Sequence, residues 1–373
     1  MNEALSREEG EGRTPVERKL RELLFDPDES ALDPGWTRAQ ALVSELALRP
    51  AKRLRPKLLH AGYLAGGGTD PAPDGFWTFA TGLEVLHTFM LIHDDVADQS
   101  AIRRGGPALH PSMGPGRLGE NLAVVAGDHL FARAVELLFT APLRTAPAAA
   151  AYYLKVCRHT AVGQFLDIEL GRRAWSEITP FDALKVAELK TAQYSVAAPL
   201  GCGAMLAGAS TASVETLQRL GRFAGVAFQL QDDLAGLFGD PLATGKPTDC
   251  DLRECKKSFP LLLAYRRATS RERRCLERLG AEASPEELER VKAIVHRRGG
   301  VTGTRRAVDR AMAAARRVLR EGPLPPEQTA DLETLLSGLV APSTEPSVSA
   351  LGGARASIDL HPGVDRRPGG SPR

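Results

Sequence analysis

The 373-residue sequence has few cysteines, few aromatic residues and no long apolar run. Its five cysteines form no CxxC pair, which argues against a disulfide framework and against a structural zinc site. We therefore expect a reducing compartment, the cytoplasm. Because no stretch reaches the roughly 18 apolar residues that cross a bilayer, we expect no membrane span. The polar, acidic N-terminal segment does not resemble a signal peptide.

A strong net charge is also missing, since the formal charge is +2. A value this small gives no reason to expect a nucleic acid or a membrane surface as partner. Apolar residues make up 43% of the chain and charged residues 25%, which is typical of a globular protein. Alanine, leucine and arginine are abundant, and all three favour helix.

Apolar residues recur at three- and four-residue spacing along most of the chain, and convincing period-two alternation is absent. We predict an all-α fold in one large domain over residues 15–340. A disordered N-terminus (1–14) and a disordered tail rich in Pro, Gly, Ser and Arg (341–373) flank it. The helical stretches are expected at residues 36–47, 53–64, 76–92, 119–139, 148–170, 181–206, 212–238, 261–279, 285–297 and 301–320.

The most informative segment, residues 83–110, is centred on the run Asp94-Asp95-Val96-Ala97-Asp98. Asp94 and Asp98 are four residues apart, so a helix places both carboxylates on one face, where they repel each other. A divalent cation converts that repulsion into binding, and Mg²⁺ prefers such oxygen ligands and often bridges them to phosphates. His87 and Leu91 continue the same helical face. The alternative is a helix end with solvated acids.

Two arginines, Arg103 and Arg104, follow this cluster directly and precede Gly105-Gly106. Paired guanidinium groups can grip diphosphate oxygens, and glycine allows a turn or a close backbone approach. A second acidic cluster lies near residue 230, where Gln229, Asp232, Asp233 and Gly236 share a helical face. Further basic residues follow it: Lys246, Lys256 and Lys257.

The two clusters together resemble the trans-isoprenyl diphosphate synthases, also called polyprenyl synthetases. HDDVADQSAIRRGGPALH is similar to the family's first aspartate-rich motif, and FQLQDDLAGLFGDPLATGKPTDCDLRECKKS to its second. The resemblance is dense from about Arg53 to Ala264. It implies a single helical bundle of the isoprenoid synthase type with a central cavity, a soluble homodimer, and Mg²⁺, about three ions per site.

The resemblance also implies roles for individual residues. Three positions depart from the family pattern: Pro50 and Ala51 replace two glycines, and Cys255 replaces another. Gln164 and Asp167 match a further family stretch, as residues supporting the site or as a buried pair. The implied magnesium ligands are Asp94, Asp98 and Asp232, with Asp233 beside them. The implied residues of the allylic and catalytic site are Arg103, Lys190, Thr191, Gln229, Lys246 and Lys256. The implied isopentenyl diphosphate site comprises Lys52, Arg55, His87 and Arg104.

The implied reaction is a head-to-tail condensation of isopentenyl diphosphate with an allylic diphosphate. In this family, product length is set by bulk before the first motif, where this chain has Phe89 and Met90. An aromatic residue there, without an insertion in DDVAD, resembles geranylgeranyl diphosphate synthases and predicts a C20 product. Helical periodicity alone places Met90 nearer the Asp94 face. A farnesyl (C15) or a longer product is the alternative.

Two other functions remain open from the sequence. A class I terpene cyclase also uses DDxxD and Mg²⁺, but it normally carries an Asn/Ser/Glu motif in place of Asp232-Asp233. A non-catalytic partner subunit normally loses aspartates or basic residues, whereas this chain keeps both. Incubation with both diphosphates and Mg²⁺ separates the three functions by the product that forms.

Overall fold

The computed structural model describes residues 14–239, 250–253, 256–280 and 283–341. The predicted disordered ends lie almost wholly outside these ranges, so both boundaries stay predictions. Within the described ranges the fold is helical, as predicted, apart from one two-stranded antiparallel hairpin. The elements are α2 (Pro15–Leu23), η2 (Pro27–Ala31), α3 (Pro34–Leu48), α4 (Leu54–Ala65), α5 (Asp74–Ala97), β1 (Ile102–Arg103), β2 (Gly106–Pro107), α6 (Leu109–Met113), α7 (Gly116–Thr140), α8 (Ala146–Arg172), η3 (Trp175–Glu177), α9 (Pro180–Val186), η4 (Ala187–Ala197), α10 (Ala198–Ala207), α11 (Thr211–Phe238), α13 (Cys250–Arg253), α14 (Phe259–Arg267), α15 (Ser270–Glu277), α16 (Pro285–Arg297), α17 (Gly300–Glu321) and α18 (Pro326–Leu339).

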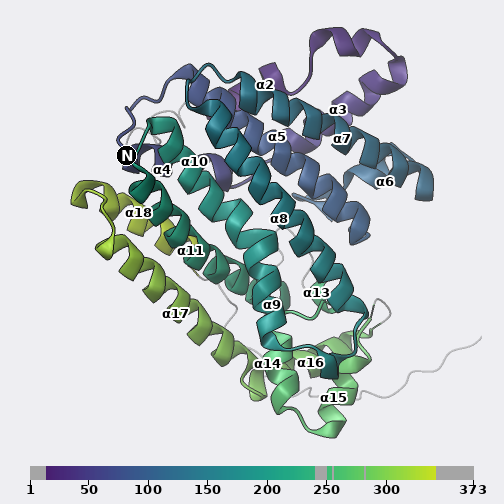
Figure 1. Cartoon of the computed structure of the whole chain (residues 1–373). Coiled ribbons are helices and arrows are strands. Elements are labelled where there is room, and N and C mark those ends of the chain that lie inside the picture. The colour runs from purple at the N-terminus through teal and green to yellow at the C-terminus, as the bar shows by residue number, and fades with distance from the viewer. Residues whose placement is uncertain (1–13, 240–249, 254–255, 281–282, 342–373) are drawn as a thin grey trace, which may run out of the picture.

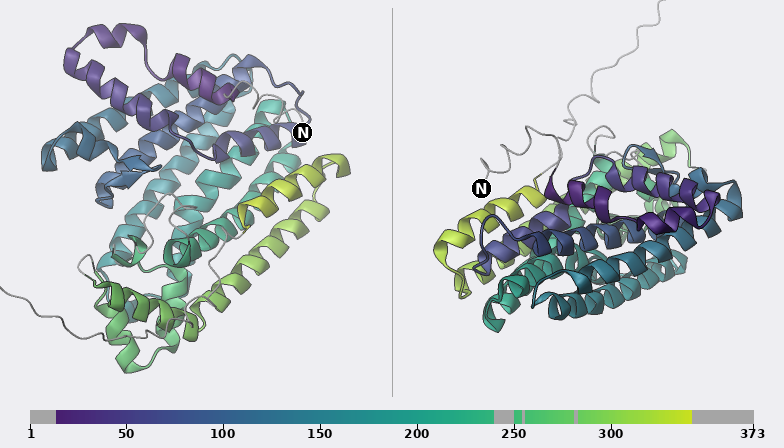
Figure 2. Two further views of the ribbon diagram at one scale, coloured as in Figure 1. Left: turned by 180° about the vertical axis from the view of Figure 1, so that it is seen from behind. Right: turned by 90° about the horizontal axis from the view of Figure 1, so that it is seen from above.

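The long helices run side by side as a bundle, with α14, α15 and α16 gathered at one end (Figures 1 and 2). Helix α5 packs on α7, α8 packs on η4, and α11 lies between η4 and α17. Helix α17 therefore covers the outer side of α11 (Figure 1). This arrangement leaves α5, α8, η4 and α11 around the interior of the bundle.

Helix α5 forms the centre of the largest apolar core, and it carries the first aspartate motif at its end. Phe76, Phe79, Leu83 and Leu86 on this helix are completely buried. By length and composition α5 could cross a membrane, yet 72% of its most apolar window is buried inside the bundle. Burial of this kind is the pattern of a core helix.

Helices α4 and α10 touch through glycines. A Cβ added at Gly62 would lie 2.1 Å from the carbonyl oxygen of Leu200, and one at Gly203 would lie 2.0 Å from that of Leu59. Neither backbone could approach the other with a larger residue at these positions. The contact fixes α4, whose first turn carries Arg55, against the helix that continues from η4.

The helix predicted at residues 181–206 is continuous but not uniform. Thr179 caps its start in a capping box with Asp182. Its middle part, η4, is a π-helix that contains Lys190 and Thr191. In a π-helix each backbone N–H bonds five residues back, and such segments often occur at functional sites.

One predicted helix is wrong in its extent. Residues 261–279 form two helices, α14 and α15, which are separated at Ala268 and Thr269. Thr269 begins α15 through a capping box with Glu272, so the chain turns where the apolar pattern continued. Helix α18 and the β1–β2 hairpin are not among the elements predicted from the apolar pattern.

Candidate active site

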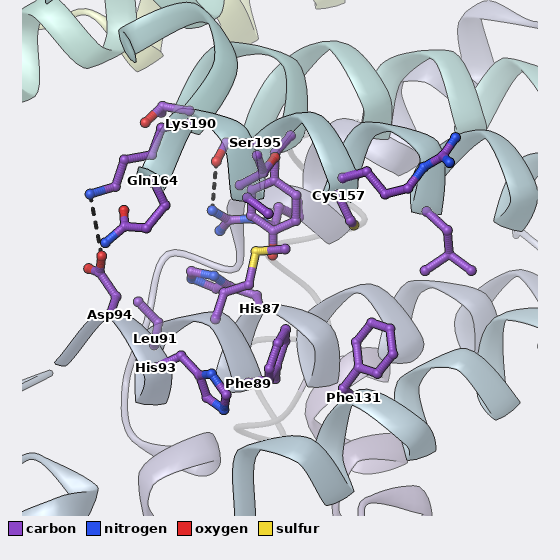
Figure 3. Close-up of a pocket in the computed structure, with 18 of the residues that line it drawn as sticks. His87, Phe89, Leu91, His93, Asp94, Phe131, Cys157, Gln164, Lys190 and Ser195 are labelled. Carbon is purple, nitrogen blue, oxygen red and sulfur yellow. Dashed lines mark hydrogen bonds and ion pairs between the residues drawn. The ribbon is translucent and has the colours of Figure 1, made fainter. Parts of the chain in front are cut away.

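A cavity of about 920 Å³ lies inside the bundle and is lined from α5, α7, α8, η4 and α11. Its two ends differ in chemistry (Figure 3). Asp94, Lys190 and Gln164 lie at one end, and Phe131 lies at the other. A ligand with a charged head and an apolar tail would match this polarity.

The first aspartate motif occupies the last turn of α5. Asp94, Leu91 and His87 all line the cavity, which confirms that they share one helical face. Asp98 is the C-cap of α5, and its N–H donates to the carbonyl oxygen of Asp94 at 2.8 Å. The two carboxylates therefore sit one helical turn apart, as predicted.

Two lysines from distant segments reach these carboxylates. The Nζ atom of Lys190 lies 3.4 Å from Asp94 and 2.8 Å from Asp167. Lys256 lies 3.2 Å from Asp98. Burial lowers the pKa of Lys190, but Asp94 and Asp167 together outweigh it, so the pKa is raised and the lysine stays charged. The side chain of Gln164 is buried with neither amide atom bonded within the described structure.

The second aspartate motif lies on α11, across the cavity from α5. Asp232 lines the cavity together with Asp94. Thr191 donates to Gln229 at 2.6 Å, and Gln229 donates to Asp233 at 2.8 Å. The π-helix and the second motif are thus connected by a short chain of hydrogen bonds that fixes the Gln229 amide.

Asp95 is a residue that the sequence analysis left without a role. It is completely buried, and both of its oxygens accept from the guanidinium of Arg103, at 2.8 and 3.1 Å for Nε. Arg103 also lies 3.7 Å from Asp94. The guanidinium of Arg103 is therefore fixed beside the first motif by the middle acid of DDVAD. Asp95 could have been identified from the need of a buried arginine for an acidic partner.

Basic residues gather around His87, about two helical turns before Asp94 on α5. Arg55 lines the cavity, donates to Ser195 at 2.6 Å and lies over the ring of Tyr194. Arg104 is largely buried, whereas Lys52 is exposed just before α4. Burial, reinforced by nearby arginines, lowers the pKa of His87 well below its ordinary value, so the imidazole is neutral.

Aromatic rings form the apolar end of the cavity. Phe89 and Met90 both line it, as predicted, and Phe131 from α7 lies 5.3 Å from Phe89 between ring centroids. Phe89 also packs on His93, at 4.6 Å. Lys246, another predicted site residue, lies outside the described residues.

The donor chemistry of the site suits magnesium. Asp94, Asp98 and Asp232 offer carboxylate oxygens, which are the hard ligands Mg²⁺ prefers. Among the described residues no three acidic, His or Cys side chains are close enough to hold a metal alone. Mg²⁺ usually binds through one or two carboxylates plus substrate phosphates, so phosphate oxygens of a substrate would complete its ligands here.

Comparisons with known proteins show which family the chain belongs to. A family model described as polyprenyl synthetase matches residues 37–297. Geranylgeranyl diphosphate synthase of Mycobacterium tuberculosis is 34% identical over 75% of this chain and 77% of its own. Geranylfarnesyl diphosphate synthase of Aeropyrum pernix is 32% identical, over 76% and 88%. A geranylgeranyl pyrophosphate synthase of Corynebacterium glutamicum, complexed with isoprenyl diphosphate and magnesium, has a TM-score of 0.78 at 29% identity, over 87% of this chain and 97% of its own.

The chain belongs to the polyprenyl synthetase family. It is a trans-prenyltransferase, which confirms the reaction class that the two aspartate motifs predicted. Enzymes of this family depend on magnesium and use isoprenyl diphosphates.

Proposed function

We propose that this enzyme condenses isopentenyl diphosphate head to tail with an allylic diphosphate and that its main product is geranylgeranyl diphosphate. The observation that carries the proposal is the polarity of one cavity, which Asp232 also lines, with Asp94 and Lys190 at one end and Phe131 at the other. A growing prenyl chain fits this arrangement, because its diphosphate binds among the charges and its tail extends between apolar side chains.

The allylic diphosphate would bind between the two aspartate motifs. Asp94, Asp98 and Asp232, with Asp233 beside them, would hold about three Mg²⁺ ions, which supply positive charge for the leaving pyrophosphate. Cations of the chain would add to that charge, since such preorganised groups stabilise the separating charges. These cations are Arg103, Lys190, Lys246 and Lys256. The oxygen atoms of Thr191 and Gln229 would face the allylic cation that forms.

The second substrate would bind around His87. Lys52, Arg55 and Arg104 would hold the diphosphate of isopentenyl diphosphate, and the neutral His87 would donate one hydrogen bond. The C–O bond of the allylic diphosphate breaks with its electron pair on the pyrophosphate. The double bond of isopentenyl diphosphate then forms the new C–C bond, and a pyrophosphate oxygen takes the proton that is lost.

The apolar end of the cavity supports the proposal that the main product has 20 carbon atoms. The rings of Phe89 and Phe131 are in contact, so a prenyl tail that extends from the charged end would reach this aromatic pair and stop there. Relatives with geranylgeranyl and geranylfarnesyl products are about equally similar to this chain, so similarity alone does not decide between C20 and C25. A C15 product is the second candidate, which a tighter fit around Met90 would favour.

We also propose a homodimer, formed through α7 and α8. These neighbouring helices expose large apolar side chains, which is unusual for a surface that faces only water. Phe131 is 40% exposed and also lines the cavity, so a second copy on this face would cover that end of it. The exposed apolar residues are Leu118, Leu122, Val125, Phe131 and Phe139 on α7, and Val162, Phe165 and Ile168 on α8.

The cytoplasm is the proposed location. Three cysteines in the described part of the chain, Cys157, Cys202 and Cys275, are free thiols. Burial raises the pKa of Cys157 to about 12, so this thiol stays protonated and unreactive. Buried free thiols agree with a reducing compartment.

The test is incubation of the purified chain with isopentenyl and farnesyl diphosphates and Mg²⁺, followed by chromatography of the dephosphorylated products. We expect geranylgeraniol as the main product and release of pyrophosphate. Asp232→Asn should lower turnover by about 100-fold or more and raise the Mg²⁺ concentration that half-saturates it. A hydrocarbon made from the allylic substrate alone, or no turnover by the wild-type enzyme, would overturn the proposal.

A further inference from the structure

Glu84 is a buried acid that the reaction above does not use. It lies on α5, one helical turn before His87, and only 1% of it is exposed. Its Oε1 atom accepts from Arg53 at 2.7 Å and from Arg104 at 3.2 Å. Its Oε2 atom has no hydrogen-bond partner within the described residues. One carboxylate thus joins two arginines from different segments, the start of α4 and the β1–β2 hairpin.

Both arginines have an unusual backbone. Arg53 has φ 45° and Arg104 has φ 52°, in the left-handed region that residues with a side chain rarely adopt. Each guanidinium also reaches the C-terminal carbonyl groups of α3, and they share the oxygen of Ala47, at 2.8 Å for Arg53 and 3.4 Å for Arg104. The end of α3 and Glu84 therefore hold the two side chains from two sides, which offsets the strained backbone.

The two arginines belong to the basic cluster around His87. Arg55, Arg104, Arg103 and Arg53 are all close enough to act on the charge of this imidazole. Within this cluster Asp95 bonds to Arg103, whereas Glu84 is the buried acid that bonds to Arg53 and Arg104. Glu17 lies farther away, at 3.6 Å from Arg53. Guanidinium groups recognise phosphate oxygens through directed pairs of hydrogen bonds, so their orientation matters as well as their charge.

We propose that Glu84 is a positioning residue that orients Arg104, through its shared bond with Arg53, toward the diphosphate of isopentenyl diphosphate. This inference rests on the proposed isopentenyl site. It opposes the simplest electrostatic expectation, because removal of a negative charge from a cluster of arginines would by itself strengthen the binding of an anion. If Glu84 positions Arg104, loss of its charge should weaken the binding of isopentenyl diphosphate, whereas if it only neutralises charge, the same loss should strengthen that binding.

Two substitutions separate these effects. Glu84→Gln removes the charge and keeps the length of the side chain. Glu84→Asp keeps the charge but withdraws the carboxylate by about 1.5 Å, beyond bonding reach of both guanidinium groups. The matched controls are Glu289→Gln and Glu289→Asp, because Glu289 is an exposed acid on α16 that pairs with Lys292.

Steady-state kinetics with each substrate varied in turn provides the readout, with Tm from circular dichroism to show that the variants fold. We expect Glu84→Asp, which loses both bonds, to raise the KM for isopentenyl diphosphate about tenfold. Glu84→Gln keeps an amide oxygen that can accept from both arginines through weaker, neutral bonds, so it should raise this KM by about threefold. The KM for the allylic diphosphate should stay within about twofold of wild type, and kcat at saturation within about threefold. The Glu289 variants should change none of these values.

Three results would overturn the inference. A lower KM for isopentenyl diphosphate in Glu84→Gln, with a wild-type value in Glu84→Asp, would show that Glu84 only neutralises charge. If the Glu84 variants raised the KM for isopentenyl diphosphate and the KM for the allylic diphosphate equally, or if neither variant folded, Glu84 would be needed only for folding. An unchanged KM in both variants would show that Arg104 needs no such support. Failure of the proposed function is distinct, because the wild-type chain would then form no longer prenyl diphosphate.

Discussion

The substitution Phe89→Ala tests directly whether an aromatic pair limits the length of the product. Phe89 lies between the aspartate end and Phe131 along the cavity (Figure 3). The substitution removes about six carbon atoms, slightly more than the five of one isoprene unit. We therefore expect the main product to lengthen by about one unit, from C20 to C25, with Phe131 as the next barrier.

The cost in stability should be moderate. Phe89 is only partly buried, so the substitution enlarges an existing cavity and leaves no sealed void. It removes the ring contacts with His93 at 4.6 Å and Phe131 at 5.3 Å. At about 0.5–1.5 kcal/mol for each aromatic pair, loss of the two contacts costs about 1–3 kcal/mol, in addition to the area that the ring buries. Because the ring is only partly buried, the total should stay below the upper end of the range of about 3–5 kcal/mol that is typical of Phe truncation in a core, and the variant should fold.

The assay compares products by chromatography for wild type, Phe89→Ala, Phe131→Ala and the double variant. If Phe89 is met first, Phe131→Ala alone should keep the wild-type product, and the double variant should form still longer chains. Phe181→Ala is the control, since Phe181 is 74% exposed at the start of α9. An unchanged product from Phe89→Ala, in a variant that folds and turns over, would refute this reasoning.

Three further outcomes follow from the site and the surface. Lys190→Ala should lower kcat by on the order of 100-fold with little change in Tm, whereas the control Lys292→Ala should leave kcat unchanged. Burial lowers the pKa of His87 in the folded protein, so below about pH 6.5 His87 is protonated in the unfolded chain but stays neutral in the folded one. The free energy of unfolding should therefore fall by up to about 1.4 kcal/mol for each pH unit below this value. Chemical denaturation at several pH values should show a weaker pH dependence for His87→Gln. Phe165→Glu should convert a dimer into a monomer of about 40 kDa by light scattering, while Phe181→Glu should not, and a monomeric wild type would contradict the dimer.

Helical periodicity predicted most of the fold, since it depends mainly on which faces are apolar. The expected helix at residues 119–139 appears as α7, and the one at 301–320 as α17, each with ends shifted by only a few residues. The failure at residues 261–279 has a local cause. The apolar pattern runs through Thr269, and only the hydrogen bonds between Thr269 and Glu272 end one helix and begin another.

Within the site, the sequence predicted the residues whose pattern is local. Asp94 and Asp98 are one turn apart, and that spacing can be read directly. The partners of these acids could not be found in this way, because Lys190 and Lys256 reach Asp94 and Asp98 only through the tertiary fold. For Arg103 and Arg104, the resemblance implied contacts with diphosphates, whereas the structure also assigns each of them an acidic protein partner.

The π-helix η4 has a consequence for the tolerance of the chain to deletions. In an α-helix, residues five apart point about 140° away from each other. Lys190 and Ser195 nevertheless both line the cavity, where Lys190 reaches Asp94 and Ser195 reaches Arg55. If the segment relaxed into an α-helix with all of its residues kept, one of the two side chains would rotate out of the cavity. Loss of one residue between them would instead leave them four residues apart, about 40° apart on an α-helix, so both side chains could still face the cavity. The chain should therefore tolerate a single deletion between Lys190 and Ser195 better than elsewhere in this helix.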